Sequence, residues 1–140
     1  MKAARGARRR RALAYLWVAP VTLVGLVLAG LALVCGARAR WVDGQLEVAG
    51  ARRLGRVGRW PPVRDIAAIT LGHVILGRDH ATLARWRRHE QVHVRQYERW
   101  GVLFWPLYLG ASAWAWLHGR RAYLDNPFEI EARKADTDPS

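Results

Sequence analysis

Two long apolar segments dominate the pattern of hydrophobic and polar positions along this chain. The first, residues 13–34, contains no charged side chain and exceeds the roughly 20 residues that an α-helix needs to cross a bilayer. The second, residues 102–117, is also uncharged but shorter. The pattern predicts a tail at residues 1–12, a transmembrane anchor at residues 13–36, and a folded domain at residues 37–140.

Shorter segments whose apolar and polar patterns predict strands, turns and a loop follow the first apolar segment. Residues 41–48 alternate around Asp43-Gly44, a dipeptide that favours a two-residue type I′ hairpin. Residues 50–62 are rich in Gly, Arg and Pro and predict a loop. Residues 66–76 are apolar and rich in β-branched side chains, which predicts a single strand. His73 lies within that strand and matches no metal-ligand spacing, so we expect it to pack in the core or at a sheet edge.

A long helix is predicted next. Asp79 is a suitable N-cap residue, the helical pattern runs to about Trp100, and Gly101 suits a helix end. Strands at residues 41–48 and 66–76 followed by helices predict an α+β fold for the domain.

Composition and charge narrow the class of protein. The chain has 140 residues, is 51% hydrophobic and carries a formal net charge of +12, so it is not a disordered chain. The charge fits anionic lipid headgroups, nucleic acid, or a genome that encodes arginine in place of lysine, since Lys2 and Lys134 are the only lysines. No recognised nucleic-acid-binding motif is present, so we favour lipid over nucleic acid as the partner.

The basic residues before the first apolar segment raise the question of whether that segment is a cleaved signal peptide or a membrane anchor. They resemble the start of a secretory signal, and Ala37-Arg38-Ala39 is a weak cleavage match. The apolar segment is longer than the 7–15 residues of a signal core, which favours an uncleaved anchor. The positive-inside rule then favours a cytoplasmic N-terminus and a domain on the other side. Cys35 is the only cysteine, so no intramolecular disulfide can form.

The predicted helix carries the sequence His89-Glu90-Gln91-Val92-His93. Residues i and i+4 share one face of a helix, so both imidazoles can reach one ion. Two imidazoles and a carboxylate suit zinc and leave its fourth position open. Glu90 lies beside that face and is the candidate general base. An exposed His–Glu helix face without metal is the alternative.

A third ligand is expected from residues 125–131. Pro127 suits the first turn of a helix, which places Glu129 and Glu131 near its start. Because they are two residues apart, their side chains face different ways and only one of them can reach the ion.

The two-part pattern of His89-Glu-Gln-Val-His93 and Glu129-Ile-Glu-Ala132 resembles the gluzincin class of zinc metallopeptidases, particularly its minimal bacterial members. The resemblance covers about residues 66–136. It implies a zincin-like domain in which His89, His93 and Glu129 bind zinc, with Glu131 at a variable position.

One position departs from the gluzincin pattern. Many members have an Asp directly after that alanine, which orients a ligand histidine. This chain has Arg133 there, and Asp136 and Asp125 are the candidates to replace the missing carboxylate.

The zinc hypothesis constrains residues 102–117. A full crossing would place His93 and Glu129 on opposite sides of the membrane, about 30 Å apart. The segment is therefore expected to be a buried helix, an interfacial helix, or a re-entrant hairpin broken near Pro106 and Gly110.

Four further residues are candidates to stabilise an oxyanion, as a Tyr or His does in many gluzincins: Tyr97, Tyr108, His118 and Tyr123. For each of them we favour packing or interfacial anchoring, and we leave them out of the catalytic set.

The expected function is that of a membrane-anchored zinc metallopeptidase that hydrolyses peptide bonds. Two alternatives remain open: a catalytically inactive zincin-like membrane protein, and a basic, Trp-rich membrane-surface protein without metal.

Overall fold

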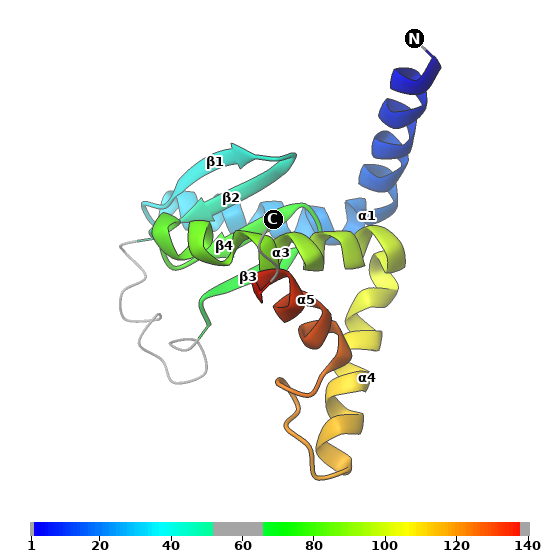
Figure 1. Ribbon diagram of the computed structural model, residues 1–140. Coiled ribbons are helices and arrows are strands. Elements are labelled where there is room, and N and C mark those ends of the chain that lie inside the picture. The colour runs from blue at the N-terminus through cyan, green and yellow to red at the C-terminus, as the bar shows by residue number, and fades with distance from the viewer. Residues whose placement is uncertain (1, 52–65, 138–140) are drawn as a thin grey trace.

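The computed structural model describes residues 2–51 and 66–137 and shows a mixed α+β fold (Figure 1). Most of the loop predicted at residues 50–62 lies outside the described residues. In chain order the elements are α1 (Lys2–Val34), β1 (Arg38–Val42), β2 (Gln45–Ala49), β3 (Ala68–Leu71), β4 (Val74–Gly77), α3 (His80–Trp100), the short 3₁₀ helix η3 (Gly101–Leu103), α4 (Phe104–Leu117) and α5 (Pro127–Thr137).

The strands form one sheet in the order β1-β2-β4-β3. β1 and β2 are an antiparallel hairpin, and β2 pairs with β4 in parallel. Asp43 and Gly44 have φ angles of 51° and 86°, as a type I′ turn requires at its two central positions. The hairpin predicted at this dipeptide is confirmed.

The single strand predicted at residues 66–76 is wrong. The chain reverses at Gly72 and His73, and β3 and β4 pair antiparallel with Leu71 opposite Val74. Gly72 has a φ of 64°, which a two-residue hairpin turn can require at its first position. Gly72 also packs against Thr22 of α1, where a Cβ would not fit. The apolar composition is the same in one long strand as in two short ones, so it did not reveal the reversal.

Helices cover both faces of the sheet (Figure 1). Val48 and Val74 pack on one face against Ala29 of α1. The neighbouring residues Ala49 and Ile75 pack on the other face against α3. Since successive side chains of a strand point to opposite faces, β2 and β4 are apolar on both sides because both sides are covered.

The boundaries of α3 agree with the prediction. The Asp79 Oδ1 atom accepts a hydrogen bond from the backbone N–H of Thr82 at 2.7 Å, which caps the first turn. Gly101 follows the last turn with a φ of 58°, and its N–H donates to the carbonyl of Tyr97.

Helix α1 contains the first apolar segment and is long and apolar enough to cross a membrane. It also forms part of the folded core. Val18 and Val21 pack in one cluster with Leu71, Tyr97 and Phe104. Figure 1 shows the first turns of α1 leaving the body while the remainder runs behind the sheet.

The second apolar segment forms η3 and α4. Only Gly101, Phe104 and Ala115 are buried there, so most of the segment is not buried inside the protein. Helix α4 extends away from the sheet, and the chain returns beside it to α5, which packs against α3 (Figure 1).

Candidate metal centre

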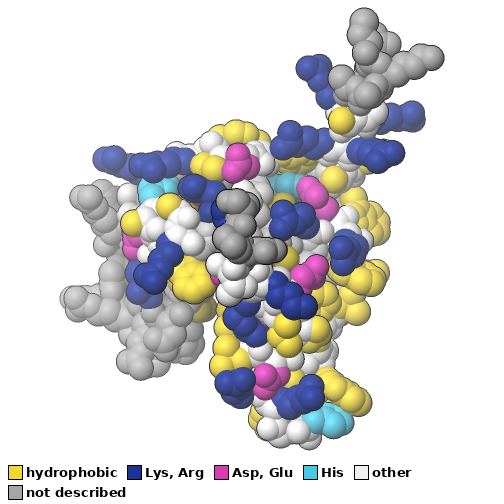
Figure 2. Space-filling view, in the orientation of Figure 1, with side chains coloured by type: hydrophobic (Ala, Val, Ile, Leu, Met, Phe, Trp, Pro, Cys, Tyr) yellow, Lys and Arg dark blue, Asp and Glu magenta, His cyan; other side chains and the backbone are white. Residues whose placement is uncertain are grey.

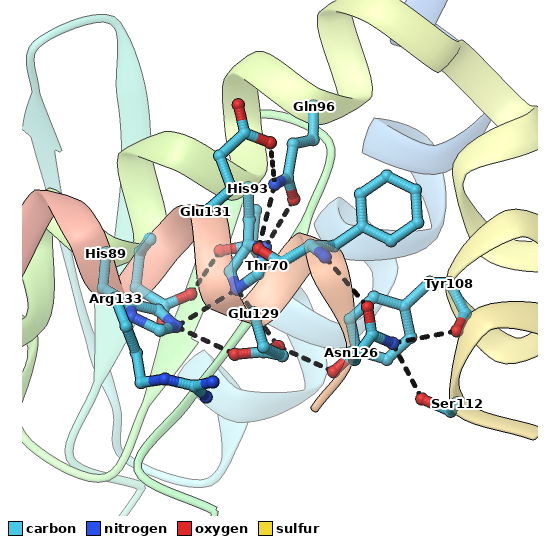
Figure 3. Close-up of polar contacts among 12 residues, drawn as sticks. Thr70, His89, His93, Gln96, Tyr108, Ser112, Asn126, Glu129, Glu131 and Arg133 are labelled. Carbon is cyan, nitrogen blue, oxygen red and sulfur yellow. Dashed lines mark hydrogen bonds and ion pairs between the residues drawn. The ribbon is translucent and has the colours of Figure 1, made fainter. Parts of the chain in front are cut away.

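Three buried side chains meet between α3 and α5: His89, His93 and Glu129 (Figure 3). One possible ligand atom from each lies within 4.8 Å of the others. The two Nε2 atoms are 3.2 Å apart. Glu129 Oε2 is 3.2 Å from His89 Nε2, and Glu129 Oε1 is 3.4 Å from His93 Nε2. This group could hold a metal ion.

The outer nitrogens of both imidazoles have partners. His89 Nδ1 lies 3.0 Å from Asp136 Oδ2, and His93 Nδ1 lies 2.9 Å from Gln96 Oε1. Both partners are oxygen acceptors, so each Nδ1 carries the hydrogen. In the neutral rings, two Nε2 lone pairs then face each other beside the carboxylate of Glu129, whose Oε2 makes no hydrogen bond. Such a cluster requires a cation or protons.

The pKa values of His89, His93 and Glu129 are shifted by burial and by the charges of their neighbours. Burial lowers the pKa of His93, but the nearby Glu129 carboxylate outweighs burial and raises that pKa overall. The pKa of His89 is raised for the same reason, with help from Asp136. Burial raises the pKa of Glu129, yet its contacts with the two histidines hold that pKa well below its usual range. A metal ion entering this cluster would displace protons from it.

The structure distinguishes between the two candidate carboxylates of α5. Glu129 is buried and faces the histidines. Glu131 points elsewhere, and its Oε2 accepts a hydrogen bond from Gln96 Nε2 at 2.8 Å. Glu131 therefore supports the side chain that holds His93 rather than joining the cluster.

Contacts that place α5 were not foreseen in the sequence. Asn126 is fully buried, and its Oδ1 accepts from the N–H of Phe128 at 2.9 Å. Its Nδ2 donates to the carbonyl of Tyr108 and to Ser112 Oγ of α4. Gln96 Nε2 also donates to the carbonyl of Phe128. The sequence Asn-Pro-Phe-Glu was a usable signal, because Asn is a preferred N-cap and Pro a preferred first helical residue.

Glu90 lies beside the cluster and faces a cavity. Its Oε2 accepts a hydrogen bond from Thr70 Oγ1 at 2.6 Å, and burial raises its pKa. The cavity measures about 230 Å³. Apart from the cluster itself, its walls include Ile66, Ile69, Phe104, Trp105, Tyr108 and Tyr123.

The four oxyanion candidates have different surroundings. The Tyr97 hydroxyl donates to the carbonyl of Thr70 and is buried. The Tyr108 hydroxyl donates to Glu129 Oε1 at 2.6 Å. Tyr123 lines the cavity. His118 lies at the end of α4 beside Trp114, away from the cavity.

Asp136 occupies the place expected for a carboxylate that orients a ligand histidine. It lies two helical turns beyond Glu129, so both side chains fall on the same face of α5. Asp125 instead pairs with Arg121 at 3.2 Å, and Arg133 donates to the carbonyl of Leu124. Of the two candidate carboxylates, Asp136 is therefore the one that contacts His89.

No family model and no curated or solved protein matches this chain. The functional inference therefore rests on the geometry of the cluster.

Substitutions in α5 test the third ligand. Glu129→Gln should sharply lower the stoichiometry of bound metal, because a neutral amide replaces the only carboxylate in the cluster. Glu131→Gln should retain the metal. Elemental analysis of both purified variants provides the comparison, and equal loss in both would contradict the assignment.

Asp136→Asn should weaken metal binding about 10- to 100-fold, the usual effect of losing a carboxylate that orients a ligand histidine. Asp125→Asn is the control, because Asp125 pairs with Arg121 rather than with a histidine of the cluster, and its affinity should equal that of wild type. Competition with a chromophoric chelator measures both affinities. Unchanged affinity in Asp136→Asn would remove this residue from the site.

Proposed function

We propose that this protein is a membrane-anchored zinc metallopeptidase of the gluzincin type. The observation that supports it is the convergence of His89, His93 and Glu129 on one point, with Glu90 beside them at a cavity. In this proposal the first three residues hold the ion and Glu90 is the general base.

Zinc is the metal that this set of donors suits. Two imidazole nitrogens and one carboxylate oxygen are a common set in catalytic zinc sites, which keep a fourth position open. Zinc bound there would supply Lewis-acid activation of a water molecule near neutral pH.

Glu90 has the surroundings of a general base. Thr70 holds one carboxylate oxygen at 2.6 Å, which limits the side chain to an orientation facing the cavity. A carboxylate positioned in this way can act as a general base in the transition state. Glu90 would accept the proton of the attacking water and deliver it to the departing amine.

The edge of the sheet supports a peptide as substrate. Within the described residues, β3 is an edge strand, and its residues Ala68, Ile69 and Thr70 line the cavity. An extended peptide can add to a free strand edge through backbone hydrogen bonds. The mostly apolar cavity walls would accept its side chains.

Helix α1 is the proposed membrane anchor. Arg8, Arg9, Arg10 and Arg11 are exposed at its start, and each arginine near an anionic surface contributes about 1 kcal/mol. From the sequence alone, a single crossing with the N-terminus in the cytoplasm is the expected arrangement.

Metal content is the measurement that tests the proposed centre. Wild type should purify with about one zinc per chain, because His89, His93 and Glu129 form one site. His93→Ala should lose most of it, and the exposed His118→Ala should keep it. No metal in wild type prepared without chelator would refute the proposal. Bound zinc without hydrolysis of any peptide in a library would favour a non-catalytic site.

A further inference from the structure

The outward face of α1 is an apolar surface with no protein cover among the described residues. Val18, Val21, Gly25 and Ala29 recur every three or four positions and are buried. Ten of the other positions between residues 16 and 34 expose large apolar side chains: Leu16, Trp17, Leu23, Val24, Leu26, Val27, Leu28, Leu31, Leu33 and Val34.

The inward face of α1 is joined to the sheet by specific contacts. Tyr15 donates to the carbonyl of Gly44 at 2.5 Å and stacks on His73 with ring centroids 4.1 Å apart. Gly25 lies so close to the sheet that a Cβ would be 2.8 Å from the Cβ of Val74. These contacts extend from the β1–β2 turn to the middle of the sheet.

Helix α4 provides a second apolar surface. Trp114, Trp116 and Leu117 are 64%, 70% and 71% exposed, and no residue from 102 to 117 is charged. Figure 2 shows hydrophobic side chains along the lobe that α4 forms. At about 1.5 Å per residue, a helix of this length is too short to cross a hydrocarbon core of about 30 Å.

Basic residues lie at one end of each apolar helix. Arg11 precedes the apolar part of α1 and is exposed. Arg120 and Arg121 follow α4 and are also exposed. Arginines at helix ends are placed to reach the level of anionic headgroups while the apolar turns next to them contact acyl chains.

We infer that a lipid bilayer covers the outward face of α1 together with α4, while the sheet stays packed on the inward face of α1. This differs from a single crossing. A crossing helix would carry the packed sheet into the hydrocarbon, where the open edges of β1 and β3 would leave backbone groups unsatisfied. The folded protein therefore lies in one leaflet, and its two ends are on the same side of the membrane.

This arrangement defines where the proposed site would act, and that consequence rests on the proposed function. Phe104, Trp105 and Tyr108 of α4 line the cavity beside Glu129. With α4 in the lipid, the cavity is held at the membrane surface. Its substrates would be peptide segments that lie at or emerge from the bilayer rather than freely soluble peptides.

The side of the membrane from which each end of the chain can be labelled distinguishes the one-leaflet arrangement from a single crossing. In a Cys35→Ala background, Ala7→Cys and Thr137→Cys each place one thiol at an exposed position. A membrane-impermeant maleimide is applied to sealed spheroplasts and to inverted vesicles that contain the full chain. One leaflet predicts that both variants are labelled in the same preparation. Labelling of the two variants in opposite preparations would establish a crossing and overturn the inference.

Fluorescence quenching by brominated phospholipids tests α4 separately. The wild-type chain is reconstituted in vesicles of phosphatidylcholine and phosphatidylglycerol, beside Trp114→Ser/Trp116→Ser and the control Trp86→Ser on α3, which covers the opposite face of the sheet. The double variant should lose a large part of the quenchable emission, and the control should lose almost none. Equal quenching in all three proteins, or a dimer in which α4 is shielded, would overturn the role of α4. Neither readout depends on metal or hydrolysis, so a failed peptidase assay leaves both results valid.

Discussion

Glu90→Gln is expected to bind zinc as tightly as wild type and to hydrolyse peptides about 10²- to 10⁴-fold more slowly. The amide keeps the shape of the side chain and can still contact Thr70 Oγ1, which lies 2.6 Å from the carboxylate. It cannot accept the proton of the attacking water. Hydrolysis rates and metal content, measured on the same preparation, separate the two properties.

Glu98→Gln is the matched control for this prediction. Glu98 belongs to the same helix but pairs with His73, at 3.0 Å, on the side facing α1. This variant should hydrolyse peptides at the wild-type rate. A Glu90→Gln variant with full activity would exclude Glu90 as the base, and loss of metal in that variant would make the rate uninformative about proton transfer.

Removal of residues 1–36 is expected to prevent folding of the remaining chain. Val18 and Val21 complete a core with Leu71, Tyr97 and Phe104, and burying a valine contributes about 1.5–3 kcal/mol. Removal would also expose the face of the sheet formed by Val48 and Val74. Losses of this size approach the 5–15 kcal/mol that stabilises a typical domain.

Two point variants of α1 measure, in the full chain, how much the packing of this helix contributes to the free energy of unfolding. Val18 is fully buried and Val27 is 65% exposed. Val18→Ala should lower the free energy of unfolding by about 2 kcal/mol, while Val27→Ala should change it by less than about 0.5 kcal/mol. Urea unfolding of both variants in the same detergent provides the comparison. Equal effects would mean that α1 is not packed on the sheet in solution.

Features that depend on neighbouring residues could be read from the sequence. The Asp43-Gly44 turn, the Asp79 cap and the end of α3 at Gly101 each rest on backbone preferences within a few residues. The pairing of His89 with His93 rests on the period of the helix alone. These predictions needed no knowledge of the remainder of the chain.

Other features depended on contacts between distant segments. The turn at Gly72 and His73 packs against α1, about fifty residues earlier in the chain. Parallel pairing of β2 with β4 joins segments on either side of β3. An apolar pattern shows that a segment is buried but does not show which partner buries it.

The candidate centre shows the same division. By itself the sequence determined that two imidazoles share one face of α3. It also indicated that a helix starting at Pro127 supplies two candidate carboxylates for a third ligand. Only the tertiary structure decided between Glu129 and Glu131, because the contacts of Asn126 and Gln96 set the rotation of α5 about its axis. A long apolar helix likewise has the same composition whether lipid surrounds it or a sheet covers one face, and only packing distinguishes the two.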